Sequence, residues 1–328
     1  MTKRILITAG DPCGIGPEII LRALERARLR SFLADAVIIG DLRVFERAAA
    51  RLGVRLPRWS VQPSCEQSLK EGSFIFLDSA SKARFEPGLS GPHAGRASLG
   101  YLATAVKLLK RGDAGALVTA PVSKWAIERV HPGFSGHTEY LASAFGARDV
   151  VMLFASQKLR VVLLTRHMAL RDVSRALTRR LLKVTLNITL EGLKRQFGIA
   201  KPKLVVCGLN PHAGEDGLFG NEEKRVIAPV LKQFRSRGWA VEGPVASDGL
   251  FAQPIRVDAI VCAYHDQALI PFKMAARDSG CQVTLGLPFV RTSPDHGSAL
   301  DIAGKAKAHP GAMRYALRLA AQLRASSR

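Results

Sequence analysis

The sequence is poor in cysteine pairs and in long apolar runs, and each shortage excludes a class of protein. The five cysteines, at 13, 65, 207, 262 and 281, are scattered and form no CxxC pair. This excludes a disulfide framework and a zinc–thiolate site, and Cys207 and Cys262, inside apolar runs, are predicted to be core residues. No apolar run approaches the roughly 18–20 residues needed to cross a bilayer. The N-terminus, MTKRILITAGDP, does not resemble a signal peptide, so we expect a cytoplasmic protein without membrane partners.

Acidic residues are also scarce. The chain has 48 Lys+Arg against 27 Asp+Glu, a formal net charge of +21, which makes a nucleic-acid-binding protein the non-enzyme hypothesis. However, the basic residues are spread along helix-like segments such as 21–30, 179–184 and 314–324. There is no basic arm, zinc-finger spacing or RNA-binding aromatic motif. We therefore favour a general compositional bias or the attraction of anionic substrates over a nucleic-acid partner.

The 328 residues contain neither an internal repeat nor a long linker rich in Pro, Gly and Ser. Short β-branched runs alternate with helix-like segments, which predicts an α/β protein with a largely parallel, doubly wound sheet. The expected strands cover 4–10, 35–41, 116–122, 149–156, 159–165, 202–208 and 258–264, and the clearest helical segments are 17–29, 94–111 and 172–196.

The loop GDPCGIGPE (10–18) joins the first expected strand to a helix that starts near Pro17. Pro suits the first helical turn, and free N–H groups at a helix N-terminus suit an anion. The spacing matches neither GxGxxG nor GxxxxGK[ST]. An anion site and a simple tight turn both remain open.

Three histidines each follow the end of an apolar run: His167 in VVLLTRHMAL, His212 in VVCGLNPHAGE and His265 in IVCAYHDQAL. Ligands of open α/β sheets bind beyond the carboxyl ends of the strands, and three imidazoles with open coordination positions suit Zn²⁺ or Co²⁺. The alternative is three isolated loop residues. Asp266 fits either an orienting partner of an imidazole or a helix cap.

His137 and Thr138 lie in PGFSGHTEYLA (132–142), where a loop enters a helix. An imidazole and a hydroxyl there can bind a substrate, or they can form an ordinary N-terminal cap.

The segment HGSALDIAGKAKAHP (296–310) resembles a loop of the isocitrate and isopropylmalate dehydrogenases, which are β-decarboxylating enzymes. In those families the loop binds the adenosine part of NAD(P), which implies cofactor contacts by His296, Gly297 and Asp301. The position of Asp301 discriminates between the two cofactors there, because a carboxylate repels the 2′-phosphate of NADP. The resemblance therefore implies a preference for NAD. The alternative is that Asp301 caps a following helix.

A closer resemblance runs nearly from end to end. The motifs that carry it are GDPCGIGPE (10–18), TAPVSK (119–124), GHTEYLA (136–142), GLNPHAGEDGLFGNEE (208–223), YHDQALIPFK (264–273) and TLGLPFVRTSPDHGSALDIAGK (284–305). Together they resemble the 4-hydroxythreonine-4-phosphate dehydrogenase family of pyridoxal 5′-phosphate biosynthesis.

This resemblance implies an isocitrate/isopropylmalate dehydrogenase-like α/β fold with two lobes and an active-site cleft between them. The approximate lobes are 1–125 plus 285–328, and 126–284, the latter carrying the metal, the substrate and the dimer contacts. It also implies a homodimer with the active site at the interface, where one histidine ligand comes from the neighbouring subunit. We expect His167 and His265 variants to complement each other accordingly.

The implied reaction is NAD(P)-dependent oxidation of the 3-hydroxyl of 4-hydroxy-L-threonine 4-phosphate to a ketone. The β-keto acid then loses CO₂ and leaves 3-amino-2-oxopropyl phosphate. A paralogue acting on D-threonate or D-erythronate 4-phosphate is the main alternative. A relative acting on a dihydroxy-cyclohexadiene dicarboxylate is another.

The family's functional positions fall on specific residues of this sequence. The implied metal ligands, for Zn, Co or Mg, are His167, His212 and His265. The implied substrate-binding residues are His137, Thr138, Lys273, Arg291 and Gln282, the last replacing a family Asn. Lys273 and Arg291 supply positive charge for a carboxylate or a phosphate, and the candidates for proton transfer are Asp248, Asp266 and Lys273.

Overall fold

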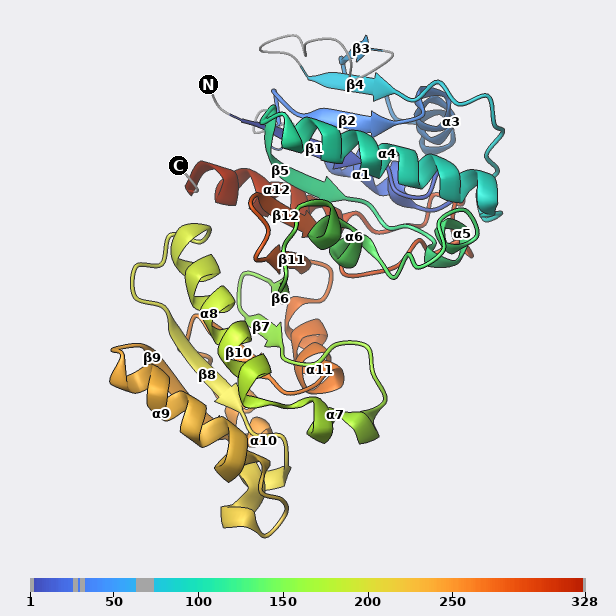
Figure 1. Ribbon diagram of the computed structural model, residues 1–328. Helices are drawn as coiled ribbons and strands as arrows, with labels where there is room; N and C mark the ends of the chain where they lie inside the picture. The colour runs from blue at the N-terminus through green and yellow to red at the C-terminus, as the bar shows by residue number, and fades with distance from the viewer. Residues whose placement is uncertain (1–2, 26–28, 30–32, 63–73, 327–328) are drawn as a thin grey trace. The chain divides into compact units, whose positions relative to one another are not determined.

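The computed structural model describes residues 3–25, 29, 33–62 and 74–326 of the chain. Cys65 and part of the helix expected over 17–29 lie outside the described residues. The chain divides into two compact units, residues 1–148 with 287–326, and residues 149–286. Each unit has its own α/β architecture (Figure 1).

The first unit is built on parallel strands in the order β3-β4-β2-β1-β5-β12. Their bounds are β1 (Arg4–Thr8), β2 (Val37–Gly40), β3 (Ser60–Gln62), β4 (Ile75–Asp78), β5 (Ala114–Thr119) and β12 (Val290–Ser293). The central strands β1 and β2 are buried along their whole length. This continuous burial explains why they are apolar throughout and do not alternate.

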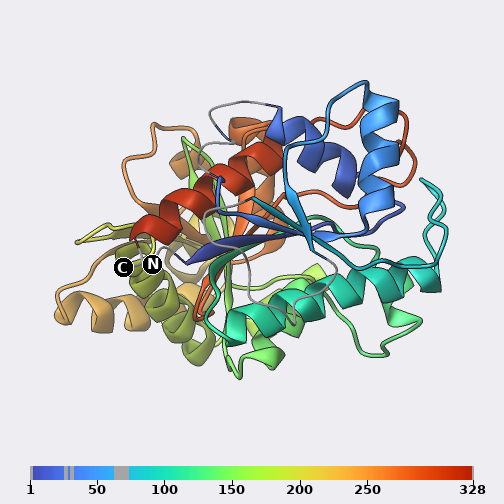
Figure 2. The ribbon, with the colours of Figure 1, turned by 90° about the horizontal axis from the view of Figure 1, so that it is seen from above.

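Helices cover both faces of this sheet. In Figure 2, α4 and α12 lie on opposite sides of the strands. The helices are α1 (Gly16–Leu24), α3 (Leu42–Leu52), α4 (Pro92–Lys110), α5 (Lys124–Glu128), α6 (His137–Ala144) and α12 (Gly311–Ser326). The first unit is therefore doubly wound, as the strand–helix alternation predicts.

The second unit has a mixed sheet in the order β11-β6-β7-β10-β8-β9. Its strands are β6 (Val151–Ala155), β7 (Arg160–Leu163), β8 (Lys203–Cys207), β9 (Ala240–Val245), β10 (Ala259–Cys262) and β11 (Cys281–Leu285). β6 is antiparallel to both its neighbours, whereas β7, β10, β8 and β9 run parallel. The parallel part places the ends of β7, β10 and β8 at one edge.

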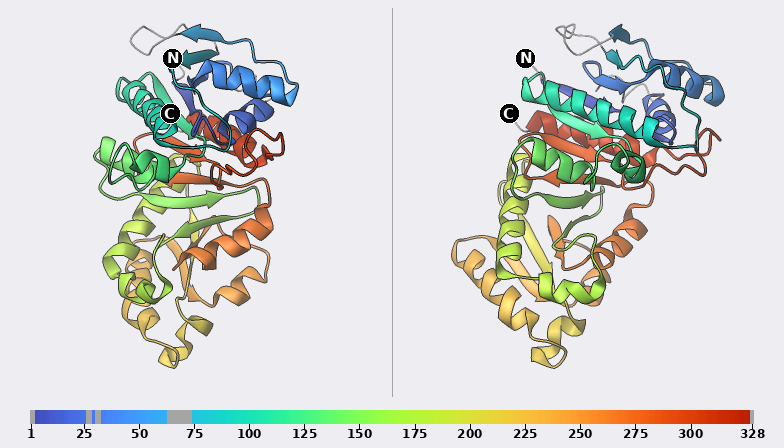
Figure 3. Two further views of the ribbon diagram at one scale, coloured as in Figure 1. Left: turned by 90° about the vertical axis from the view of Figure 1, so that its right-hand side faces the viewer. Right: turned by 45° about the vertical axis from the view of Figure 1, so that its right-hand side comes forward.

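The helices of the second unit also pack on both faces, with α8 and α11 on opposite sides of the strands in both views of Figure 3. They are α7 (Leu170–Ala176), α8 (Arg179–Arg195), α9 (Ala228–Ser236), α10 (Ser247–Phe251) and α11 (His265–Ala276), with a 3₁₀ turn η1 (Pro211–Gly217) and a π-helical turn η2 (Glu223–Ile227).

The predicted α/β class with largely parallel strands is confirmed, and each of the seven expected strands overlaps an observed one. The segment 172–196, expected as one helix, is two helices, because the Thr178 hydroxyl caps the Leu181 N–H at 3.1 Å and starts α8. Cys207 and Cys262 are core residues, and neither forms a disulfide. In the described part of the chain, no helix is both long and apolar enough to cross a membrane.

The boundary between the units lies after residue 148, and not after residue 125 as expected. The reason is close packing within the first unit. A Cβ on Gly95 of α4 would lie 2.0 Å from the Ala126 carbonyl oxygen of α5, so the two helices meet backbone to backbone. Further along the chain, the ring of Phe145 packs against that of Phe289 at 4.8 Å. His137 and Thr138 therefore belong to the first unit.

Candidate functional site

His167 and His265 are brought together by the pairing of two parallel strands. Leu163 of β7 is in register with Cys262 of β10, and Thr165 extends the contact by donating its N–H and its hydroxyl to the Ala263 carbonyl, at 3.1 and 2.6 Å. His167 lies two residues after Thr165, and His265 lies two residues after Ala263. Their ring centroids are 5.6 Å apart. Strand register therefore creates a pair of imidazoles at the carboxyl edge of the second unit.

Asp266 contacts the neighbouring imidazole. Its Oδ1 lies 2.7 Å from Nδ1 of His265. The N-cap of α11 is Tyr264 and has no side-chain cap hydrogen bond, so the helix-cap alternative for Asp266 is wrong. An Nδ1–H that donates to a carboxylate leaves Nε2 as the metal-binding nitrogen, which is the usual arrangement around histidine ligands.

His212 lies in a strained loop. Five successive residues, 212–216, have positive φ angles between 40° and 86°, and only one of them, Gly214, is glycine. Left-handed backbone costs roughly 1–2 kcal/mol per non-glycine residue, and such strain persists only where the surroundings impose it. The loop begins directly after β8, the strand that pairs with β10.

The donor set suits a divalent transition metal only in part. Two imidazoles bound tetrahedrally to one zinc ion at about 2.1 Å have centroids about 5 Å apart, and the His167–His265 pair is close to that spacing. However, the described residues contain no cluster of three His, Cys, Asp or Glu side chains that could hold an ion. The chain thus supplies a fitting pair, and His212 does not complete it within one copy.

The other predicted residues of the second unit are more scattered. Asp248 is exposed in the first turn of α10, and Lys273 is exposed on α11. Gln282 is buried on β11 and donates to the Thr284 hydroxyl at 3.0 Å.

A second group of predicted residues lies in the first unit. Arg291 of β12 is 3% exposed and donates to the Thr119 hydroxyl at the end of β5, at 2.7 Å. His137 is the first residue of α6 and Thr138, the second, is buried. The N-cap of α6 is Gly136, without a side-chain cap bond, so the capping alternative for His137 and Thr138 is wrong.

His137 has an unusual electrostatic setting. Burial, reinforced by the positive charges of Arg291 and Lys124, lowers the pKa of His137 to about 3. Its imidazole is therefore neutral near pH 7, and it can donate one hydrogen bond and accept another. Arg291 and His137 together offer one cation and one neutral hydrogen-bonding ring.

Four N–H groups of the loop GDPCGIGPE are hydrogen-bonded within the protein. Asp11 N–H donates to the Pro121 carbonyl at 2.9 Å, and Cys13 N–H donates to the Asp11 carboxylate at 2.8 Å. Gly14 N–H bonds the Asp11 carbonyl, and Ile15 N–H bonds the Ser298 carbonyl, both at 3.0 Å. These bonds favour the tight-turn alternative over an anion site.

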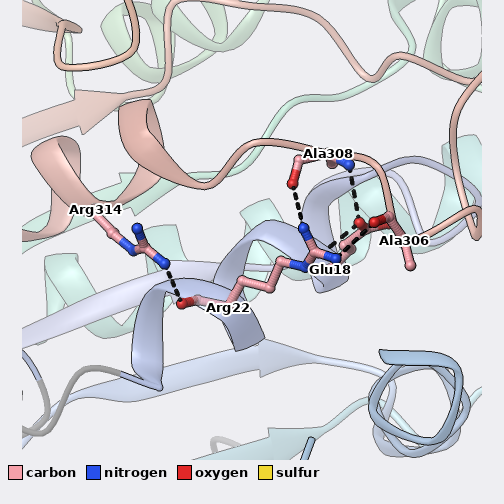
Figure 4. A network of polar contacts seen from close by, with 5 residues as sticks. All are labelled: Glu18, Arg22, Ala306, Ala308 and Arg314. Carbon is pink, nitrogen blue, oxygen red and sulfur yellow. Dashed lines mark hydrogen bonds and ion pairs between the residues drawn. The ribbon is translucent and has the colours of Figure 1, made fainter. Parts of the chain in front are cut away.

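The loop 296–310 is fastened to α1, as Figure 4 shows. Glu18 accepts the Ala308 N–H at 3.0 Å, and Arg22 donates to the carbonyls of Ala306 and Ala308 at 2.6 and 3.1 Å. Arg314 in turn donates to the Arg22 carbonyl at 3.1 Å. These contacts set the path of the loop that carries the predicted cofactor residues.

The predicted cofactor residues lie at the surface of that loop. His296 Nδ1 is 3.0 Å from the Gly297 carbonyl oxygen. Asp301 is exposed in a run of turns, and α12 begins only at Gly311. Asp301 therefore caps no helix, so that alternative is wrong.

Comparison with known proteins decides the family. A family model described as "Pyridoxal phosphate biosynthetic protein PdxA" matches residues 33–320. The chain belongs to the PdxA family. Two curated relatives are 4-hydroxythreonine-4-phosphate dehydrogenases. The one from Desulforapulum autotrophicum is 41% identical over 96% of this chain and 94% of its own length. The one from Erythrobacter litoralis is 42% identical over 98% and 96%.

Two solved structures resemble this chain over nearly its whole length. The 4-hydroxythreonine-4-phosphate dehydrogenase of Klebsiella pneumoniae is 34% identical, covers 99% of this chain and 98% of its own, and has a TM-score of 0.84. The terephthalate 1,2-cis-dihydrodiol dehydrogenase of Burkholderia xenovorans is 31% identical, covers 98% of both chains and has a TM-score of 0.65.

Two polar residues of this PdxA chain were missed by sequence reasoning. Glu223 is 3% exposed and hydrogen bonds the loop of His212. Gln267 accepts the Ala263 N–H at 2.6 Å and donates to the Gly208 carbonyl and the Ser247 hydroxyl, both at 2.7 Å. Both lie in motifs that carry the family resemblance, GNEE and YHDQAL, and membership of these motifs was the available sign.

Proposed function

We propose that this PdxA-family protein is a 4-hydroxythreonine-4-phosphate dehydrogenase. It oxidises the 3-hydroxyl of 4-hydroxy-L-threonine 4-phosphate with reduction of NAD(P)⁺ to NAD(P)H and release of a proton. The resulting 3-keto acid loses CO₂ and gives 3-amino-2-oxopropyl phosphate. The observation that carries the proposal is the identity of 41–42% to relatives of that name over nearly the whole chain.

A second substrate class is favoured by one observation. The terephthalate 1,2-cis-dihydrodiol dehydrogenase has the same fold at 31% identity, so this scaffold accepts a cyclic diol dicarboxylate as well as a phosphorylated hydroxy acid. Gln282, which replaces a family Asn, is one position where the substrate pocket of this chain differs. D-Threonate and D-erythronate 4-phosphate remain alternatives within the phosphorylated class.

The substrate-binding roles follow from charge and hydrogen-bonding capacity. Arg291 suits bidentate contact with a phosphate or a carboxylate, and its bond to Thr119 orients the guanidinium. His137 and Thr138 offer neutral hydrogen-bonding groups beside it. Lys273 is proposed as a second cation for the substrate. Asp248, Asp266 and Lys273 are the proposed proton-transfer groups.

His167, His265 and His212 are the proposed ligands of one divalent ion, Zn²⁺, Co²⁺ or Mg²⁺, with imidazole favouring the first two. The chemistry that such an ion supplies when bound is Lewis-acid polarisation of a coordinated substrate oxygen. Asp266 keeps the His265 ring oriented through its 2.7 Å contact.

A homodimer is part of this proposal. Six large apolar side chains of the second unit are 45–75% exposed. They follow the three histidines along the chain: Met168 and Leu170, Leu218 and Phe219, and Ile270 and Met274. Exposed apolar side chains near functional residues are typical of an interface. A second copy seated there would bring a third imidazole to the pair that one chain provides.

The cofactor proposal is a nicotinamide dinucleotide on the loop 296–310, held by His296, Gly297 and Asp301, with NAD preferred over NADP. It is supported by the exposure of Asp301, whose carboxylate is not engaged as a helix cap.

The test is NADH formation by the purified protein with three substrates: 4-hydroxythreonine 4-phosphate, D-threonate 4-phosphate and the cis-dihydrodiol of terephthalate. We expect the highest kcat/KM with the first. A His167→Ala variant controls for contaminating dehydrogenases. Turnover of only the dihydrodiol would replace the main proposal by the second.

A further inference from the structure

The loop that carries His212 is anchored by one buried carboxylate. Glu223 Oε1 accepts the backbone N–H groups of Leu209 and Asn210, each at 2.8 Å. Its Oε2 accepts the Asn210 side-chain amide at 3.0 Å. These bonds hold the residues that lead from β8 into the left-handed run that begins at His212.

The same carboxylate also limits the path of the loop. A Cβ on Gly214 would lie 2.8 Å from Glu223 Oε2, and a Cβ on Gly208 would lie 3.2 Å from Oε1. The loop thus folds closely around the carboxylate, so that only glycine fits at 214. Glu222 supports the arrangement from outside, since its Oε2 also accepts the Asn210 amide at 2.8 Å.

Burial and strain together indicate a role beyond stability. Glu223 is 3% exposed, and a buried carboxylate is retained where its hydrogen bonds are needed, because burying its charge is costly. The strained backbone at 212–216 must be imposed by its surroundings. The carboxylate bonds the start of the loop and lies close to its left-handed part at Gly214.

We infer that Glu223 is a positioning residue for His212. By bonding Leu209 and Asn210 it holds the left-handed loop in the one conformation that directs the His212 imidazole to the divalent ion. The inference rests on the proposed function, in which His212 is a metal ligand. Residues that orient metal ligands by hydrogen bonds, without touching the metal, typically contribute 10–100-fold to metal affinity.

Three variants test this. Glu223→Ala removes all three bonds. Glu223→Gln keeps the shape, but its amide nitrogen would face the Asn210 amide as a second donor. Glu215→Gln is the matched control: it removes the same charge from an exposed side chain of the same loop.

The readouts are Co²⁺ affinity of the full-length protein, by competition with a chelator, and hydrogen exchange of the loop amides. We expect Glu223→Ala to lower Co²⁺ affinity by about 10–100-fold and to speed exchange at Leu209 and Asn210. Glu223→Gln should lie between Glu223→Ala and wild type, and Glu215→Gln should bind like wild type. Circular dichroism checks that the fold is retained.

If Glu223→Ala does not fold, Glu223→Gln decides in its place, and equal Co²⁺ affinity for it and Glu215→Gln overturns the inference. Wild-type affinity in Glu223→Ala, with or without faster exchange, also overturns it while leaving the proposed function intact. If the wild-type protein binds no divalent ion, the proposed metal role is wrong, and the inference about Glu223 fails with it.

Discussion

At the scale of single residues, the histidines of this chain differ by their electrostatic surroundings. His265 lies beside the carboxylate of Asp266, which favours an oriented, metal-binding ring. His137 lies beside Arg291 and Lys124, and burial with these cations lowers its pKa to about 3. The first ring is suited to a cation and the second to neutral hydrogen bonding of a substrate.

The low pKa of His137 predicts a pH dependence of stability. Above the ordinary value of 6.5, the imidazole is neutral in both the folded and the unfolded chain. Below 6.5, the unfolded chain binds a proton that the folded chain excludes until about pH 3, so the folded state loses stability as pH falls through this window. The melting temperature of wild type relative to His137→Asn should therefore fall between about pH 7.5 and about pH 5.

Thermal melts across this range measure the difference, with His131→Asn, an exposed histidine, as control. A difference between wild type and His137→Asn that stays constant with pH would contradict the assigned burial.

Asp301 is expected to set the preference between the two nicotinamide cofactors. Its carboxylate would repel the 2′-phosphate of NADP, and a difference of about 1.4 kcal/mol is tenfold in affinity. We expect wild type to prefer NAD by at least about tenfold in kcat/KM, and Asp301→Ser to reduce that ratio. Steady-state kinetics with both cofactors measures it, and Asp278→Ser removes a carboxylate of the other unit as control. Equal use of NAD and NADP by wild type would show that Asp301 does not discriminate.

At the scale of elements, close backbone contacts decide how helices and loops pack. The α4–α5 contact at Gly95 keeps residues 126–148 in the first unit, and the Thr178 cap separates α7 from α8. The first contact depends on the absence of a side chain at Gly95, and the second depends on the hydroxyl of Thr178. A single substitution therefore tests each contact.

Gly95→Ala should destabilise the protein. Its Cβ would lie 2.0 Å from the Ala126 carbonyl oxygen, so α4 and α5 must separate, at a cost of about 1–3 kcal/mol. Gly100→Ala on the same helix is the matched control, because nothing lies within 4 Å of its Cβ and alanine favours helix by roughly 0.5–1 kcal/mol. Chemical denaturation should show opposite shifts for the two variants, and a neutral Gly95→Ala would refute the close contact.

At the scale of the whole molecule, the proposed dimer predicts which subunits share a site. Sequence reasoning expects His167 and His265 variants to complement each other. The structure places those rings 5.6 Å apart in one chain, so a second copy is better suited to supply His212.

We therefore expect mixed His212→Ala and His265→Ala proteins to regain activity, because one chain of a hybrid keeps the pair and the other keeps His212. Random exchange makes about half the dimers hybrid with one intact site of two, so recovery is at most about a quarter of wild type. A His167→Ala and His265→Ala mixture should stay inactive. If instead only the His167→Ala and His265→Ala mixture regains activity, those two histidines come from different subunits, as the sequence resemblance implies. Size-exclusion chromatography with light scattering tests whether the protein is a dimer.

The sequence by itself determined the α/β class, the seven expected strands, the histidines after strand ends and the family, because apolar periodicity and motifs are local properties of the chain. Only the tertiary structure decided that His167 lies beside His265, that Glu223 anchors the His212 loop and that the first unit extends to residue 148. Those relations join residues far apart in the chain. They depend on strand order, register and the fit of one backbone against another, none of which is encoded within a short window of residues.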